Sequence, residues 1–197
     1  MDTKIRIEKK DIFSGYYFFW FGFLIGMIVP NLLYKQKWQQ STVSALYLMG
    51  LFSGTEGKEY FLQVLKMRSI FFVLVGCSGI TVFGVPVAVM GMILLGTIIS
   101  MILTVSILQF GFYGGVIGVA LLLPQYAVYV PCLFYCFGTV YRNSASIWKR
   151  KTFFSGGIAG YTLQMFFCAA CYVVGIVLEA YCNPVIVETL IRNLKIF

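Results

Sequence analysis

The sequence contains no histidine, and this absence excludes much of the chemistry that enzymes use. Without an imidazole the chain cannot form a Ser–His or Cys–His nucleophilic dyad or a Cys2His2 zinc site. No pair of acidic residues and no cysteine cluster with polar neighbours suggests a substitute. We therefore expect no catalytic residue, no metal-ligand set and no cofactor, and we expect a protein that acts by binding.

Charged residues are also scarce. They make up 11% of the 197 residues, whereas hydrophobic residues make up 60% and the mean hydropathy is +0.88. No Asp, Glu, Lys or Arg occurs from residue 69 to residue 141. A chain of this size has too little interior to bury such long apolar runs. This excludes a soluble enzyme, a disordered chain and a small disulfide scaffold, and it predicts an all-α, polytopic integral membrane helical bundle.

The net charge of +8 does not indicate nucleic-acid binding. The basic residues flank the apolar runs, as they do in membrane proteins, and they form no stripe with interleaved aromatics. The six cysteines lie mostly inside apolar runs, where we expect them to behave as small hydrophobic residues. A redox or metal role remains the alternative, because Cys168 and Cys171 have CxxC spacing and Cys132 and Cys136 lie one helical turn apart.

The apolar runs predict about five transmembrane spans within a single membrane domain covering residues 1–197. The first is interpreted as a true span rather than a cleaved targeting sequence, because its apolar run is too long for a signal peptide. A hydrophilic loop over 34–68 and a tail over 185–197 complete the chain. The expected spans are 13–33, 69–83, 87–108, 114–141 and 154–178.

The fourth of these spans should be broken near its middle. Pro124 and Pro131 each lack a backbone N–H and disturb helix geometry. A break at membrane depth is tolerated only where protein or water satisfies the freed backbone groups. Gln125 is the side chain best placed to do so, and we therefore expect this break to be packed against protein rather than lipid.

The hydrophilic loop is expected to contain short interfacial helices over Thr42–Phe52 and Lys58–Met67. A solvated loop with an incidental apolar stripe is the alternative. We expect Arg142–Lys151 to form a compact basic loop and Val185–Phe197 a short amphipathic helix, with Pro184 at its start.

The distribution of basic residues discriminates only weakly between the two orientations in the membrane. With the N-terminus in the cytoplasm, eight cations lie inside and seven outside. The first span usually dominates orientation and short loops count more than long ones. We therefore expect the N-terminus inside, the C-terminus outside, and the segment Tyr34–Arg68 on the extracytoplasmic face.

Glu179 is an acid beside a predicted span with no basic residue adjacent in the sequence and no evident partner. A carboxylate at membrane depth is costly and indicates either a structural hydrogen bond between helices or a role in partner binding. Glycines with the spacing of Gly22 and Gly26 allow helices to pack closely, either within the chain or at an interface with a second copy in a homo-oligomer or with a partner.

Three stretches of the sequence resemble one known family. They are GITVFGVP at Gly79–Pro86, LPQYAVYVP at Leu123–Pro131 and LEAYCNPVIVETL at Leu178–Leu190. In this order, and with five spans and one long hydrophilic segment after the first, they resemble the stage II sporulation protein M family. This family comprises membrane components of the engulfment machinery of endospore-forming bacteria.

The resemblance implies a non-enzymatic scaffold in the mother-cell and septal membrane. The scaffold would anchor a lytic transglycosylase, stage II sporulation protein D, and an amidase/endopeptidase, stage II sporulation protein P, which thin the septal wall. A permease-like subunit of a transporter, driven by a separate ATPase, is the alternative, and a membrane adaptor of receptor type ranks third. The candidates for partner binding or for a structural role are Pro124, Gln125, Pro131, Glu179, Tyr181 and Pro184.

Overall fold

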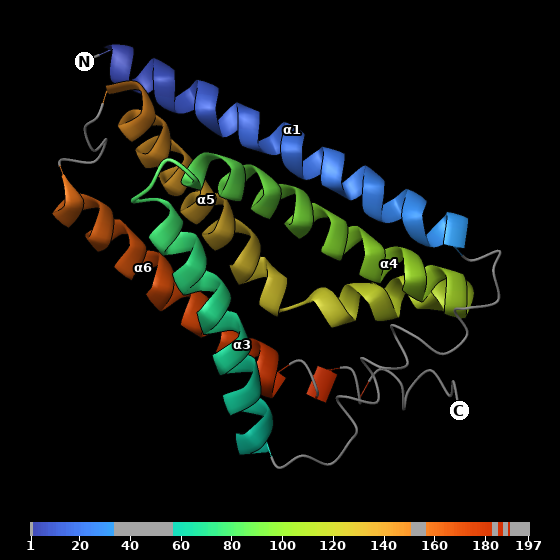
Figure 1. Cartoon of the computed structure of the whole chain (residues 1–197). Helices are drawn as coiled ribbons and strands as arrows, with labels where there is room; N and C mark the ends of the chain where they lie inside the picture. Colours follow the sequence, from blue (N-terminus) through green and yellow to red (C-terminus); the bar gives the residue numbers. More distant parts are fainter. Residues whose placement is uncertain (1, 34–56, 151–156, 183–184, 187–188, 190–197) are drawn as a thin grey trace.

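The described part of the protein consists of helices joined by short turns, and none of the described residues forms a strand (Figure 1). The structure is a computed structural model that describes residues 2–33, 57–150, 157–182, 185–186 and 189. The elements are α1 (Asp2–Leu33), α3 (Gly57–Ser78), α4 (Gly84–Leu122), α5 (Gln125–Arg150), α6 (Ile158–Val177) and the short π-helix η2 (Leu178–Cys182).

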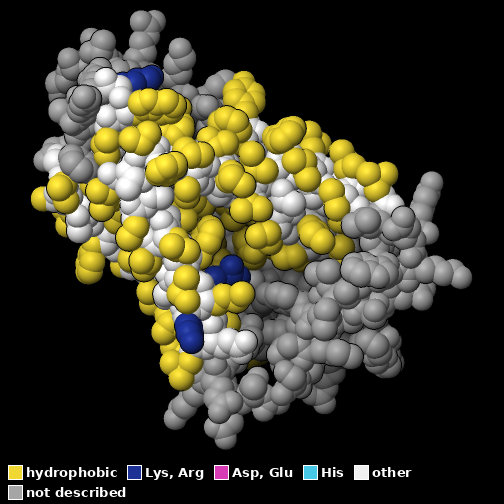
Figure 2. Space-filling view, viewed as in Figure 1, with side chains coloured by type: hydrophobic (Ala, Val, Ile, Leu, Met, Phe, Trp, Pro, Cys, Tyr) yellow, Lys and Arg dark blue, Asp and Glu magenta, His cyan; other side chains and the backbone are white. Residues whose placement is uncertain are grey.

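The expected class of an all-α polytopic membrane bundle is confirmed. Among the described residues, four helices are long and apolar enough to cross a membrane, and there are up to five crossings if the bent pair of 111–120 and 125–149 forms one span. Hydrophobic side chains dominate the described part of the face seen in Figure 2. Because such a surface faces hydrocarbon at low cost, the chain fits a multi-pass membrane protein.

The bundle consists of two helix pairs joined by α5. α1 and α4 run side by side in the same direction, and α3 and α6 form a second, antiparallel pair (Figure 1). α5 packs against both α4 and α6. The N-terminus of α1, the α3–α4 turn and the end of α5 lie at one end of the molecule, whereas the end of α1, the start of α3 and η2 lie towards the other.

Glycines bring α1 and α4 into backbone contact. A Cβ added at Gly22 would lie 2.0 Å from the carbonyl oxygen of Ile93, and one at Gly96 would lie 2.2 Å from that of Phe19. The Thr97 hydroxyl donates a hydrogen bond across this interface to the Gly22 carbonyl at 3.0 Å. The small residues of α1 therefore serve packing within the chain.

α4 reverses direction before it ends. Gly111 has φ 61°, a left-handed conformation that other residues adopt at a cost, and a Cβ added at Gly114 would lie 1.8 Å from the carbonyl oxygen of Ser106. The chain thus folds back on itself after Gly111. A second break follows at Pro124, and the helices on either side of it differ in direction by 62°. Both breaks fall where the sequence predicts them.

The α3–α4 turn is fixed by polar side chains from two other helices. The Asn143 side-chain amide donates to the Gly79 carbonyl at 2.9 Å, and the Ser144 hydroxyl donates to the Thr81 carbonyl at 2.6 Å. The Tyr161 hydroxyl on α6 donates to the Gly76 carbonyl at the end of α3. Turn carbonyls that would otherwise lack partners are satisfied within the protein.

The second span begins earlier than the sequence predicts. Lys58–Met67 is not a separate interfacial helix, because it forms the first half of α3, and the apolar window of this helix is Phe61–Ser78 rather than Ser69–Phe83. No proline or glycine interrupts the chain between Lys58 and Ile70, so the helix continues through its charged residues. The expected helix over Thr42–Phe52 lies outside the described residues.

The expected basic loop at Arg142–Lys151 is also helical as far as it is described. α5 continues to Arg150, because no glycine or proline occurs between Arg142 and Arg150. The segment 151–156 lies outside the described residues, as do most of the residues of the tail, of which 185, 186 and 189 are helical.

Candidate functional site

The helix α6 ends in the wider turns of η2, which place an acidic side chain in the interior. Glu179 lies in the first turn of η2 and is 4% exposed. Single π-helical turns of this kind frequently mark functional positions, because they change the direction in which side chains project. An isolated carboxylate would be costly there, so its partners decide what the site does.

The main partner of Glu179 is the guanidinium of Arg68, which lies 111 positions earlier in the sequence. Nη2 of Arg68 donates to Oε1 of Glu179 at 2.7 Å, and Nε of Arg68 donates to Oε2 at 3.2 Å. Both oxygens of the carboxylate are engaged by one edge of the planar guanidinium, which is the strong bidentate form of this ion pair. The pair joins α3 to the end of α6.

A third element contributes a hydroxyl to the same carboxylate. Tyr129 on α5 donates from its hydroxyl to Oε2 of Glu179 at 2.8 Å, and its side chain is buried. The guanidinium carbon of Arg68 lies 5.5 Å from the centre of the Tyr129 ring, within the range of a cation–π contact. α3, α5 and η2 are thus held at one point, which we call the Arg68–Glu179–Tyr129 network.

Aromatic rings surround this network. The Tyr129 ring centre lies 4.9 Å from that of Tyr172, and Tyr172 in turn stacks on Phe72 at 5.2 Å. A Cβ added at Gly175 would lie 2.4 Å from the Tyr129 ring, so this position requires glycine for the ring to fit. Low local polarity strengthens the ion pair and makes the loss of one member costly.

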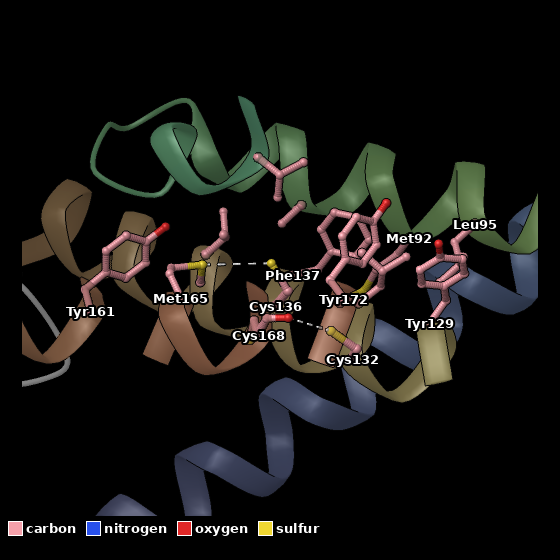
Figure 3. Close-up of a cluster of buried hydrophobic side chains, with 14 of the residues drawn as sticks. Met92, Leu95, Tyr129, Cys132, Cys136, Phe137, Tyr161, Met165, Cys168 and Tyr172 are labelled. Atoms are coloured by element: carbon pink, nitrogen blue, oxygen red, sulfur yellow. Dashed lines mark hydrogen bonds between the residues drawn. The ribbon is translucent and has the colours of Figure 1, made fainter. Parts of the chain in front are cut away.

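A sulfur-rich core lies next to the network, between α5 and α6 (Figure 3). The Cys132 thiol donates to the Cys168 carbonyl at 3.3 Å, and the sulfurs of Cys136 and Met165 are 3.9 Å apart. Cys171 is exposed, so the CxxC pair does not converge. Within the described ranges no group of His, Cys, Asp and Glu is arranged to hold a metal ion. These thiols pack as small hydrophobic groups.

The predicted site residues divide between two places. Glu179 and the exposed Tyr181 lie on η2, and the Tyr181 ring is 5.7 Å from that of Phe61 on α3. Pro124 and Gln125 lie at the bend that precedes α5, where Gln125 is fully buried, as the expected packing of this break requires.

The two remaining candidates are prolines. Pro131 lies inside α5 and is exposed. Pro184 lies outside the described residues.

The expectation that Glu179 lacks a partner is wrong. Its partner, Arg68, belongs to the predicted hydrophilic loop over 34–68, because the predicted second span begins one residue after it. Tyr129 is not among the predicted site residues, although it lies within the stretch Leu123–Pro131. The available signal is that Glu179 and two cations, Lys66 and Arg68, lie within apolar windows, which indicates an ion pair without choosing between the two cations.

Comparison with protein-family models, curated proteins and solved structures finds no match to the chain.

Proposed function

We propose that the chain is a non-enzymatic membrane scaffold that anchors peptidoglycan-degrading enzymes for septal wall thinning and engulfment during endospore formation. The observation that supports this proposal is the hydrogen bond of 2.8 Å from the Tyr129 hydroxyl to the Glu179 carboxylate. These two residues belong to two of the three stretches that resemble the stage II sporulation protein M family. Stretches that are separate in the sequence therefore meet at one point of the fold, which supports treating them as one functional unit.

The third stretch, Gly79–Pro86, forms the α3–α4 turn and is fixed by Asn143 and Ser144. All three stretches thus lie where the backbone departs from a regular α-helix, at a turn, a proline bend and a π-helix. At the turn and at the π-helix, polar side chains form hydrogen bonds within the chain. This favours a rigid platform over a mobile one, because internally satisfied networks fix helices in one arrangement.

The network braces the end of the bundle at which α3 begins and η2 ends (Figure 1). The sequence segments 34–56 and 183–197 adjoin these helix ends, and we propose that they dock the partners on the extracytoplasmic side. By resemblance the partners are stage II sporulation proteins D and P, in the mother-cell and septal membrane. A scaffold that holds two hydrolases together raises their effective concentration at the wall.

In this proposal Glu179 holds η2 in place and does not itself contact a partner. Because it is 4% exposed and bonded by Arg68 and Tyr129, it offers little surface to a partner. Tyr181, which follows it on η2, is 52% exposed and available for direct contact. Partner binding therefore depends on Glu179 through the placement of η2.

A permease-like subunit of a transporter is the second candidate, and the 62° bend between 111–120 and 125–149 favours it. Discontinuous helices line substrate sites in many transporters, because their ends offer unpaired backbone groups. The buried hydroxyl of Ser106, which lies beside Gly118 of this pair, has no hydrogen-bond partner within the described residues, so a polar group is available near the bend.

Purification of the full chain in native detergent tests the proposal. Tagged wild-type protein should retain the two hydrolases named above, and Tyr181→Ala should reduce their retention while leaving the melting temperature unchanged. Leu163→Ala, at an equally exposed position on the lipid-facing side of α6, is the matched control and should retain both. The purified chain alone should not cleave peptidoglycan.

Two outcomes would contradict the scaffold. One is wall cleavage by a preparation proven free of other enzymes. The other is stable retention of a nucleotide-binding ATPase in place of the hydrolases, which would favour the transporter.

A further inference from the structure

Arg68 keeps an unused edge in a part of α3 that is long and apolar enough to lie in the membrane. A guanidinium carries five N–H donors, and two of them bond to Glu179 through Nε and Nη2. No described residue accepts a hydrogen bond from the other three, two of which lie along the Nη1–Nη2 edge of the group. The Arg68 side chain is nonetheless 34% exposed. Three donors left to hydrocarbon would be costly.

The position of Arg68 suits a ligand that comes from the lipid. Arg68 is seven residues from the first residue of the apolar window Phe61–Ser78, about 10 Å along the helix axis. Arginine at this depth extends its head group towards the membrane surface. Phe71, one turn further along α3, is exposed, whereas Phe72 is half-buried. Arg68 therefore lies on the boundary between the lipid-facing and the buried sides of α3.

We propose that the Nη1–Nη2 edge of Arg68 binds the phosphate group of a membrane phospholipid. Two oxygens of a phosphate match the parallel N–H groups of a guanidinium edge, whereas a lysine offers only a point charge. Glu179 binds the adjacent Nε–Nη2 edge and fixes the orientation of the group. Figure 2 shows basic side chains beside the recess at the lower part of the molecule, where the apolar surface meets the grey residues.

The aromatic rings around the network favour this ligand as well. Tyr126 and Tyr129 have ring centres 5.9 Å apart, and Tyr181 lies 5.7 Å from Phe61. Tyrosines are typical of the level where lipid head groups meet the hydrocarbon. The lipid is a permanent component of this environment, so the site does not require any of the partners proposed above. This inference is independent of the scaffold function.

The test compares two lipids that differ in the phosphate. The full chain is purified in detergent and mixed with equimolar phosphatidylglycerol and diacylglycerol of the same acyl chains. Native mass spectrometry then counts the retained lipid, and thermal unfolding measures its effect on stability. Wild-type protein should retain phosphatidylglycerol about tenfold better than diacylglycerol. Equal retention of the two lipids would overturn the proposal without the need for any variant.

Arg68→Lys keeps the charge opposite Glu179 but removes the second edge, and it should lose about tenfold in phosphatidylglycerol retention. Lys66→Gln, which removes an exposed cation two residues away, is the matched control and should retain the lipid as wild-type does. Retention by folded Arg68→Lys equal to that of wild-type would overturn the proposal, as would an equal loss in Lys66→Gln. Inorganic phosphate alone should not raise the melting temperature; if it does so as strongly as phosphatidylglycerol, the site binds a free anion rather than a lipid.

Discussion

Arg68 and Glu179 are 111 positions apart in the sequence, and their side chains meet at 2.7 Å in the structure. The contact closes a long loop of the chain, and it ties the second crossing to the last. A hydroxyl from Tyr129 completes it. The stability of this end of the bundle should therefore depend on three side chains acting together.

Removal of one charge from this pair should destabilise the protein strongly. Glu179→Gln leaves the Arg68 charge without its counterion in an apolar setting, and we expect a loss of about 3 kcal/mol in the free energy of unfolding. Tyr129→Phe removes one hydrogen bond to a charged group and should cost about 1.5 kcal/mol. Unfolding of the purified protein in mixed detergent micelles measures both values.

The double variant Arg68→Gln/Glu179→Gln separates pairing from other effects. Its loss in the free energy of unfolding should be clearly smaller than the summed losses of the two single variants, because neither charge is then left without its partner. Lys66→Gln is the control and should stay within about 0.5 kcal/mol of wild-type. Additive effects of the two single substitutions would show that the residues are not energetically coupled.

The proline bend provides a second test. Gln125→Leu removes a fully buried amide at the first residue of α5, and we expect it to lower the free energy of unfolding by about 1–3 kcal/mol. Leu94→Ile, at an exposed position on α4, is the control for a lipid-facing change and should have little effect. Equal melting temperatures of the two variants in detergent would contradict a structural role for the buried amide.

The contact between α1 and α4 should tolerate no side chain at Gly22. An alanine there would bring its Cβ to 2.0 Å from the Ile93 carbonyl oxygen, so the two helices would have to separate. We expect Gly22→Ala to cost at least about 2 kcal/mol, comparable to overpacking a core. Gly138→Ala is the matched control in α5, because a Cβ at that position meets nothing within 4 Å.

The two alanine substitutions should therefore have opposite signs. Gly138→Ala gains helix propensity and should be neutral or stabilising by up to about 1 kcal/mol. Destabilisation of similar size in both variants, measured by the same unfolding assay, would mean that close approach at Gly22 does not decide the effect.

Much of the fold follows from patterns that are local in the sequence. The charge-free stretch from 69 to 141 predicts several crossings, and Pro124 and the glycines near Gly111 mark where the chain breaks, because they lack a backbone donor or a Cβ. The burial of Gln125 follows from the same reasoning, since a break at membrane depth needs protein around it.

The network at Glu179 could not be predicted in the same way. Its formation depends on α3 continuing through Lys66 and Arg68, whereas the local charge pattern favours a surface helix that ends before the span. Two charges that neutralise each other across 111 residues leave no periodic signal in either segment. The role of the acid therefore depends on a tertiary contact that neither segment indicates by itself.

The ends of the helices group the basic residues that orient the chain. The N-terminus of α1 and the end of α5 lie at the same end of the bundle (Figure 1). The division of eight cations against seven is nearly even. Because the first span usually dominates orientation, we expect this end of the bundle to lie in the cytoplasm.

Labelling of single cysteines with an impermeant maleimide tests this orientation. The background replaces the exposed Cys77 and Cys171 and the half-buried Cys182 by alanine, whereas the three buried thiols remain. Ser146 is half-buried, so the exposed Lys149 is the better cytoplasmic position, and Gln39 is the extracytoplasmic one. In intact cells Gln39→Cys should react and Lys149→Cys should not, whereas both should react once the membrane is permeabilised. Reaction at position 149 alone in intact cells would reverse the orientation and place the start of α3 in the cytoplasm, where it could couple to an ATPase as the transporter alternative requires.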